Sequence, residues 1–291
     1  MYGTRRALVH AAMLESINVR SGAKAGLDGP LDVYALSERL GLRVRFVDIS
    51  MEGFYKRGRP PQILLSALRP LARRAYTCAH EIGHHVFKHG STIDELVDNP
   101  EGSGATTAEE ISAQTFAGFL LMPTLGMRKA FAQRGWDAAK ATPAQLLTIA
   151  SAYGVGYTTI VNHLAYVLGM MPPARARELV RIPLPQVRRE VLGTATSAPL
   201  IVVDCHWTLP TIDVEVGMQV LLPKGASLED DRLVLRADTS LGRLFEALKP
   251  GIVQVERREG ESVFVRIARR QYVGLSQYRH LEETDDEEQD E

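Results

Sequence analysis

The sequence contains an H-E-x-x-H motif, formed by His80, Glu81 and His84. On a helix, two histidines four residues apart lie on one face, so both imidazoles can bind a single Zn²⁺ ion. Glu81 is rotated away from this pair by one residue and can address a water molecule on the metal. Zinc lowers the pKa of such a water towards about 7, and a nearby carboxylate can accept its proton. The motif therefore predicts hydrolysis of a carbonyl compound, with Glu81 as general base.

Apolar residues around the motif recur at helical spacing between positions 79 and 86, which indicates a packed helix. His85 and His89 form a second pair with the same spacing, but no glutamate occupies the inner position between them. We therefore assign them to supporting or surface positions. The alternative for the motif itself is a histidine-rich helix end, which the helix dipole would favour.

A catalytic zinc ion usually has three protein ligands and one open position. Glu110 is a candidate for the third ligand, because Ala113 and Ala117 share its helical face and would allow a close approach to the zinc helix. A competing interpretation is a capping box, Thr107-x-x-Glu110, in which Glu110 only satisfies the start of its helix. Glu109 remains a further alternative.

The elements that would position these residues are predicted in residues 1–140. The pattern predicts a helix near the N-terminus, a helix at 30–40, a strand at 42–46, a turn-rich basic segment at 53–61 and a short strand at 63–65. A long helix that carries the motif follows. We interpret this segment as an α-rich, zincin-like metallopeptidase domain with a small sheet.

Residues 141–172 read as a helix-turn-helix subdomain. Thr142 begins its first helix with a capping box, and the second helix is expected from Tyr157 to Leu168. Residues 142–169 contain no Lys or Arg, so direct DNA binding is disfavoured, because phosphate contacts need basic side chains. A scaffold beside the peptidase helices, or a surface that docks a protein substrate, is the better interpretation.

Prolines are frequent in residues 173–199, and this segment reads as a linker around one short helix at 173–181. Residues 200–281 change to short β-branched runs, interrupted by one helix near 240–248, and are expected to form a β-rich C-terminal domain that could sense a ligand or bind a partner. The predicted fold class is therefore α+β.

Two features of the β-rich segment could carry further chemistry. Asp204, Cys205 and His206 resemble a fragment of a nucleophile site, but a buried cysteine beside a surface histidine is the simpler interpretation. Basic residues gather near the strands at the C-terminal end and could bind acidic partners or protect strand edges: Arg257, Arg258, Arg266, Arg269 and Arg270.

The composition is that of a globular protein of 291 residues, with 45% apolar and 24% charged residues. The last ten residues, 282–291, hold eight acidic residues and no basic one, and are expected to form a disordered tail. The rest of the chain has 27 acidic and 34 basic residues. Two distant cysteines, and the lack of a signal peptide or a spanning apolar run, favour a cytoplasmic protein without a membrane segment.

The residues at the site resemble the ImmA/IrrE family of zinc metallopeptidases. The resemblance rests on the run Ala75–His84, on Glu110, and on the segment Phe116–Pro123, in which Leu120 begins a Leu-Leu-Met-Pro sequence. It covers about residues 30–170 and implies that Glu110, ten residues before Leu120, is the third zinc ligand. The sequence departs from the family at Cys78, where leucine is common, and at 112–114, where Ser-Ala-Gln replaces Glu-Ala-Asn.

The resemblance also implies a function. Members of the family are cytoplasmic proteases that cut a regulatory protein, typically a helix-turn-helix repressor, and so switch on a stress, phage or mobile-element response. The alternative is a protein-docking or DNA-binding regulator with a structural zinc site, which would not need the general base Glu81. A third possibility is a peptidase held latent by its C-terminal domain. Tyr55 and Tyr76 are candidates for oxyanion stabilisation by their proximity in sequence.

Overall fold

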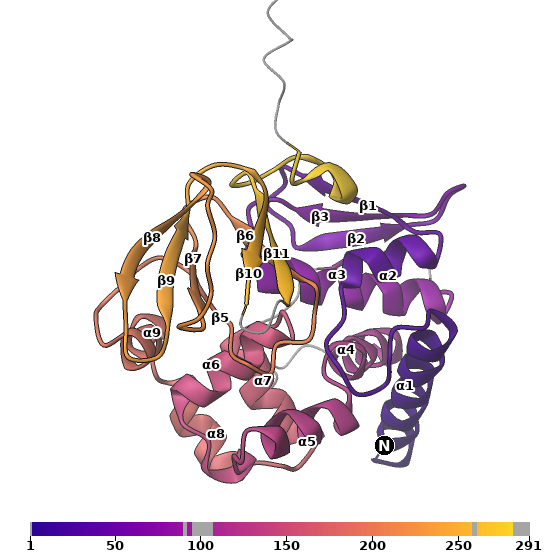
Figure 1. Ribbon diagram of the computed structural model, residues 1–291. Helices are drawn as coiled ribbons and strands as arrows, with labels where there is room; N and C mark the ends of the chain where they lie inside the picture. Colours follow the sequence, from indigo (N-terminus) through magenta and orange to yellow (C-terminus); the bar gives the residue numbers. More distant parts are fainter. Residues whose placement is uncertain (1, 90–91, 95–106, 258–260, 282–291) are drawn as a thin grey trace, which may run out of the picture.

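The computed structural model describes residues 2–89, 92–94, 107–257 and 261–281. The chain has an α+β fold, as expected, with a largely helical first part and a β-rich last part (Figure 1). The acidic tail, 282–291, and Arg258 lie outside the described residues. Among the described residues, no helix is both long and apolar enough to span a bilayer.

The first part combines helices with a small sheet. Its elements are α1 (Tyr2–Gly22), α2 (Val33–Arg39), β1 (Arg43–Val47), β2 (Gly53–Lys56), β3 (Gln62–Ser66), α3 (Leu71–Val86) and β4 (Thr92–Asp94). The sheet has the order β12-β1-β3-β2-β4, and α3 contacts β2 and β3. The motif helix therefore lies against the sheet (Figure 1).

The segment at 53–61, expected to be rich in turns, instead begins with a strand, β2. It pairs antiparallel with β3, so that Tyr55 faces Ile63 in the register, and the side chain of Tyr55 is buried. Gly53 allows the strands to meet closely, because a Cβ there would lie 2.7 Å from the Leu64 carbonyl oxygen. Pairing and burial in the folded sheet outweigh the weak local signal of this basic, glycine-containing run.

The helices that follow are α4 (Ala108–Leu121), α5 (Thr124–Gln133), the short 3₁₀ helix η1 (Ala138–Lys140), α6 (Pro143–Ala152) and α7 (Tyr157–Asn162). Thr142 and Gln145 form the expected capping box at the start of α6. The second helix of this pair differs from the expectation, because after Asn162 it continues as the π-helix η2 (His163–Val167). Single π turns of this kind are frequent at functional sites.

Segment 173–199 contains two helices, the expected short helix, α8 (Pro173–Val180), and a second one that the linker interpretation did not include, α9 (Leu184–Leu192). These contact α7 and α6 respectively, and Leu179 and Val187 are fully buried. The prolines begin helices here rather than interrupt them, because the first turn of a helix needs no N–H from proline and suits its fixed φ.

The last part contains short strands in two sheets. These are β5 (Leu200–Val202), β6 (Thr211–Glu215), β7 (Gln219–Leu222), β8 (Leu233–Asp238), β9 (Arg243–Ala247), β10 (Gly251–Glu256) and β11 (Ser262–Ala268), followed by β12 (Gly274–Leu275) and the 3₁₀ helix η4 (Ser276–Tyr278). One sheet has the order β10-β11-β6 and the other β5-β7-β9-β8.

The helix expected near 240–248 is wrong, because this segment contains strand β9. It lies between β7 and β8 and pairs antiparallel with both, with Phe245 opposite Val220 and Leu235. A strand with partners on both sides satisfies its backbone groups through neighbours that are distant in sequence, and this overrides the local helix pattern.

Strand β12 joins the two parts of the molecule. It pairs antiparallel with β1, so that Leu275 faces Arg45 and Gly274 faces Phe46. The sheet that carries the motif helix is therefore completed by residues from near the C-terminal end of the described chain.

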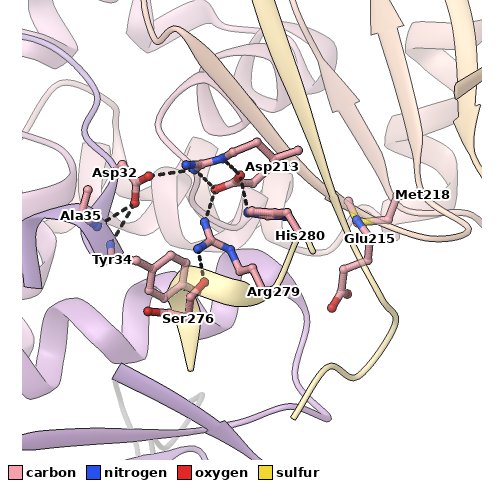
Figure 2. A network of polar contacts seen from close by, with 10 residues as sticks. Asp32, Tyr34, Ala35, Asp213, Glu215, Met218, Ser276, Arg279 and His280 are labelled. Atoms are coloured by element: carbon pink, nitrogen blue, oxygen red, sulfur yellow. Dashed lines mark hydrogen bonds and ion pairs between the residues drawn. The ribbon is translucent and has the colours of Figure 1, made fainter. Parts of the chain in front are cut away.

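A polar network also joins the two parts (Figure 2). Arg266 on β11 donates two hydrogen bonds to Asp213 on β6, at 2.6 and 2.7 Å, and one to Asp32 at 2.8 Å. Asp32 caps α2 by accepting from the backbone N–H of Tyr34 and Ala35. Arg279 donates to Asp213 at 3.0 Å. Burial would raise the pKa of Asp213, but Arg279 and Arg266 outweigh it and lower that pKa to about 2.

Two of the arginines expected on a basic surface therefore have internal partners. Arg266 is paired within the network, and Arg257 donates to the backbone carbonyl of Trp207 at 3.1 Å. Their role is to hold elements together, so neither supports the expectation of a site for acidic partners.

His280 gives this network a pH-dependent stability that can be measured. The side chain is buried, with its Nε2 atom 3.5 Å from Asp213 Oδ1, and burial together with Arg279 lowers its pKa from 6.5 to about 3. Between these values the unfolded chain binds one more proton than the folded one, so stability rises with pH. The slope from one such group is at most about 1.4 kcal/mol per pH unit.

We expect His280→Asn to reduce the slope of unfolding free energy against pH between pH 4 and pH 6 by up to one proton, measured by urea unfolding. His10→Asn, at an exposed position on α1, is the control. Equal slopes for His280→Asn and the wild type would show that His280 is not held in its neutral form.

Candidate metal centre

Helix α3 places both motif histidines on one buried face. His80 and His84 have no exposed surface, and their ring centroids lie 4.7 Å apart. Their Nε2 atoms are 3.0 Å from each other. The fully buried residues Ala79 and Ile82 contribute to the core packing of this helix. The expected helix and the expected pairing of imidazoles are both present in the structure.

Helix α4 brings Glu110 to this pair. Glu110 Oε2 lies 3.4 Å from His80 Nε2, and Glu110 Oε1 lies 3.4 Å from His84 Nε2. Thr107 does cap α4, by accepting from the backbone N–H of Glu110 at 3.2 Å, but the Glu110 carboxylate faces the histidines. The capping interpretation therefore applies to the backbone of Glu110, whereas its side chain faces the two histidines. We call His80, His84 and Glu110 the metal group. The alternative candidate, Glu109, is exposed.

The three donor groups fit one metal ion. Within the described residues, His80, His84 and Glu110 form a group whose ligand atoms all lie within 4.8 Å of one another. The separations of 3.0 and 3.4 Å resemble the edges of a tetrahedron around Zn²⁺, which are about 3.3 Å for bonds of about 2.0–2.1 Å. Three protein donors leave one tetrahedral position for water or substrate, as in catalytic zinc sites.

The close approach of α3 and α4 depends on small residues. A Cβ atom at Gly83 would lie 3.0 Å from the Cα of Ala113, so a larger residue would push the helices apart. Ala113 and Ala117 are fully buried, in line with their expected role on the contact face. The spacing between the histidines and Glu110 is therefore fixed by the two helix backbones.

Glu81 and Cys78 are both fully buried on α3. Glu81 follows His80 directly and is thus in the turn that carries the metal group. Burial raises the pKa of Cys78 to about 12, and its sulfur lies 3.4 Å from Ser37 Oγ. Cys78 therefore remains a neutral, small core residue, which explains how it can stand where the family commonly has leucine.

His85 and His89, the second pair of histidines, lie next to the metal group but are not among its three members. His89 Nδ1 lies 3.1 Å from His84 Nδ1, and His85 Nδ1 lies 2.9 Å from the hydroxyl of Tyr55. A His84 ring that binds metal through Nε2 carries its proton on Nδ1 and can donate it to His89. Burial, followed by the neighbouring His84, lowers the pKa of His89 and favours the neutral ring that can accept this bond.

We expect His89→Ala to weaken zinc binding by about 10–100-fold, because the partner that orients the His84 ring is lost. Competition with a chromophoric chelator measures this affinity. His85→Ala is the matched control, since this histidine lies on the same helix end but contacts Tyr55. If the two variants bind zinc equally, the His84–His89 contact does not support the metal group.

The metal group opens to a cavity of about 1700 Å³. Its wall includes His80 and Glu110, Tyr76 from the preceding turn of α3, and residues of the β-rich part such as Thr211. The phenol of Tyr76 donates to the Gln114 carbonyl oxygen at 3.2 Å. Of the two tyrosines suggested by the sequence, Tyr76 therefore lies in the cavity of the metal group, whereas the hydroxyl of Tyr55 is bound to His85.

The structure corrects the expectation of a buried Cys205 and adds one ion pair that the sequence did not indicate. Cys205 is exposed rather than buried, and Asp204 beside it is paired with Arg134 at 2.7 Å, so this segment is no nucleophile site. The ion pair between Arg74 on α3 and Glu215 on β6 was missed. No local pattern could reveal it, because the partners are 141 residues apart.

Comparison with known families agrees with the site. Residues 37–165 match a peptidase family model described as the IrrE N-terminal-like domain, and this segment contains all four proposed site residues. The resemblance seen in the sequence is thereby confirmed for this part of the chain. No curated protein gives a significant match.

Proposed function

Since residues 37–165 match the IrrE N-terminal-like domain of a metallopeptidase family, we propose that the protein is a zinc-dependent endopeptidase that cleaves a regulatory protein. The observation that carries this proposal is the convergence of His80, His84 and Glu110 beside the buried Glu81, in a wide cavity. The donor set suits zinc, and a purely structural site would need neither an open position nor a general base.

His80, His84 and Glu110 would hold the ion. Zinc bound there would supply Lewis acidity towards a water molecule and the scissile carbonyl. Glu81 accepts the proton of the attacking water as the new C–O bond forms, and then delivers it to the leaving nitrogen as the C–N bond breaks. Burial raises the pKa of Tyr76 to about 12, so its phenol stays protonated. If it leaves the Gln114 carbonyl, this phenol can donate its hydrogen bond to the carbonyl oxygen of the substrate.

The proposed substrate is a helix-turn-helix transcriptional repressor, whose cleavage switches on a stress, phage or mobile-element response. This part rests on the resemblance to ImmA/IrrE peptidases. Such a repressor acts in the cytoplasm, and we propose the same location for this protein. The alternative of a DNA-binding regulator is disfavoured, because α6 and α7 contain no basic residue and the Tyr157 side chain, at the start of α7, is buried.

The test is incubation of the zinc-loaded protein with the helix-turn-helix repressor encoded by a neighbouring gene, followed by intact-mass analysis. We expect two fragments whose masses add up to the repressor plus one water molecule. A chelator should prevent cleavage and added zinc should restore it. A repressor that stays intact while it binds tightly would instead identify a protein-docking regulator.

A further inference from the structure

The loop between β5 and β6, residues 203–210, forms part of the cavity that contains the candidate metal centre. Trp207 and Leu209 from this loop line the cavity, as do His80 and Glu110. The loop belongs to the β-rich part and lies outside the matched peptidase segment. A polypeptide bound at the metal group therefore enters a cavity whose wall includes this loop.

Two arginines, which come from different elements, hold this loop in place. Arg134 at the end of α5 donates to both carboxylate oxygens of Asp204, at 2.7 and 2.9 Å. Arg257, after β10, donates to the backbone carbonyl oxygens of Trp207 at 3.1 Å and of Asp204 and Cys205 at 3.4 Å. Bidentate arginine–carboxylate pairs fix orientation strongly, so the loop is held in one conformation before any ligand arrives.

The same cavity offers apolar surface from both parts of the molecule. Tyr166 and Val167, at the end of the π-helix η2, line the cavity with 49% and 44% of their surface exposed. Large apolar side chains that remain exposed in a cavity are typical of binding sites. The indole N–H of Trp207 is buried and has no acceptor within the described part of the chain. A carbonyl group of a bound polypeptide could supply one if the ring shifted slightly.

We propose that Trp207 and Leu209 form a recognition subsite for a large apolar side chain of the substrate, such as leucine or phenylalanine. The occupant is a polypeptide, because the cavity also contains the metal group and is larger than the roughly 300–1,000 Å³ of small-molecule sites. This inference rests on the proposed peptidase function, and it gives the β-rich part a role in selecting the substrate.

The subsite has a measurable effect on selectivity. Leu209→Ala removes three carbon atoms from the cavity wall, and contacts of this size change discrimination between substrates by about 10–200-fold. We expect kcat/KM to fall by about 10–100-fold for peptides with a large apolar side chain at the recognised position, and little for the same peptides with alanine there. Zinc content should not change. Leu241→Ala, at a 61% exposed position of the β-rich part that does not line this cavity, is the matched control.

The experiment uses the full, zinc-loaded chain and a library of peptides from a digested bacterial lysate. Mass spectrometry of the new termini gives the residue preference around the cut. Wild type and Leu241→Ala should favour a large apolar residue at one fixed distance from the cut, and Leu209→Ala should lose this preference. A second readout uses binding without cleavage. The chain has two tryptophans, so Trp136→Phe leaves Trp207 as the single tryptophan, which can be excited selectively at wavelengths longer than those that tyrosine absorbs, and Glu81→Gln in the same protein prevents turnover.

Each outcome decides between the two proposals. Cleavage without an apolar preference, or with a preference that Leu209→Ala does not alter, overturns the subsite and leaves the peptidase function standing. An absence of cleavage, combined with a change in Trp207 emission that only apolar peptides cause, removes the peptidase proposal and supports the subsite. An absence of both cleavage and emission change overturns both.

Discussion

Glu81→Gln is expected to lower the rate of substrate cleavage by at least about 10²–10⁴-fold, the usual contribution of a positioned general base. Glutamine keeps the size of the buried side chain but cannot accept the proton of the attacking water. Because Glu81 is outside the group of proposed ligands, zinc content and thermal stability should stay close to those of the wild type. Fragment formation from the repressor, followed over time by mass analysis, measures the effect.

His84→Ala separates this role from metal binding. It removes a ligand, so both zinc and activity should be lost, whereas Glu81→Gln should lose activity alone. Cleavage by Glu81→Gln at the wild-type rate would rule out the proposed hydrolytic mechanism and favour a structural metal site.

Glu110→Ala is expected to lower zinc occupancy markedly from about one ion per chain, because two histidines alone hold zinc weakly. Zinc bound to the folded chain adds stability that depends on its concentration, so the rise in melting temperature on adding zinc should also shrink. Elemental analysis and thermal unfolding measure these two effects.

Glu109→Ala is the matched control for Glu110. Its side chain is the same, it lies one residue earlier in α4, and it is exposed. If Glu109→Ala loses zinc and Glu110→Ala keeps it, the third ligand is Glu109. If both variants keep their zinc, the third ligand is His85 or His89 instead.

The sequence predicts the centre of the site well because its signals are local. The spacing of His80 and His84 determines their common face on a helix, and the small residues of α4 indicate a close helix contact. Glu110 is different, because its spacing left it open between a metal ligand and a capping residue, and only the resemblance to the ImmA/IrrE family implied the ligand role. The histidine spacing, by contrast, is a purely local pattern. Local patterns of this kind depend only on helix geometry, which tertiary packing leaves intact.

The parts that sequence reasoning missed depend on partners far along the chain. Segment 243–247 looks helical in isolation and becomes a strand because β7 and β8 lie on either side of it. The pairing of Arg266 with Asp32 spans 234 positions, and no periodicity can indicate it. The second helix in 173–199, α9, was missed for a different reason, since proline disrupts a helix interior but suits a first turn.

The pairing of β12 with β1 has a consequence for biosynthesis. A chain that emerges from the ribosome has made β1 long before Gly274 and Leu275 are translated, so this edge of the N-terminal sheet stays open until they appear. Contacts of such long sequence separation form late and slow the folding of the whole. The sheet beneath the motif helix is thus completed only after Gly274 and Leu275 have left the ribosome, which would delay proteolytic activity until that point.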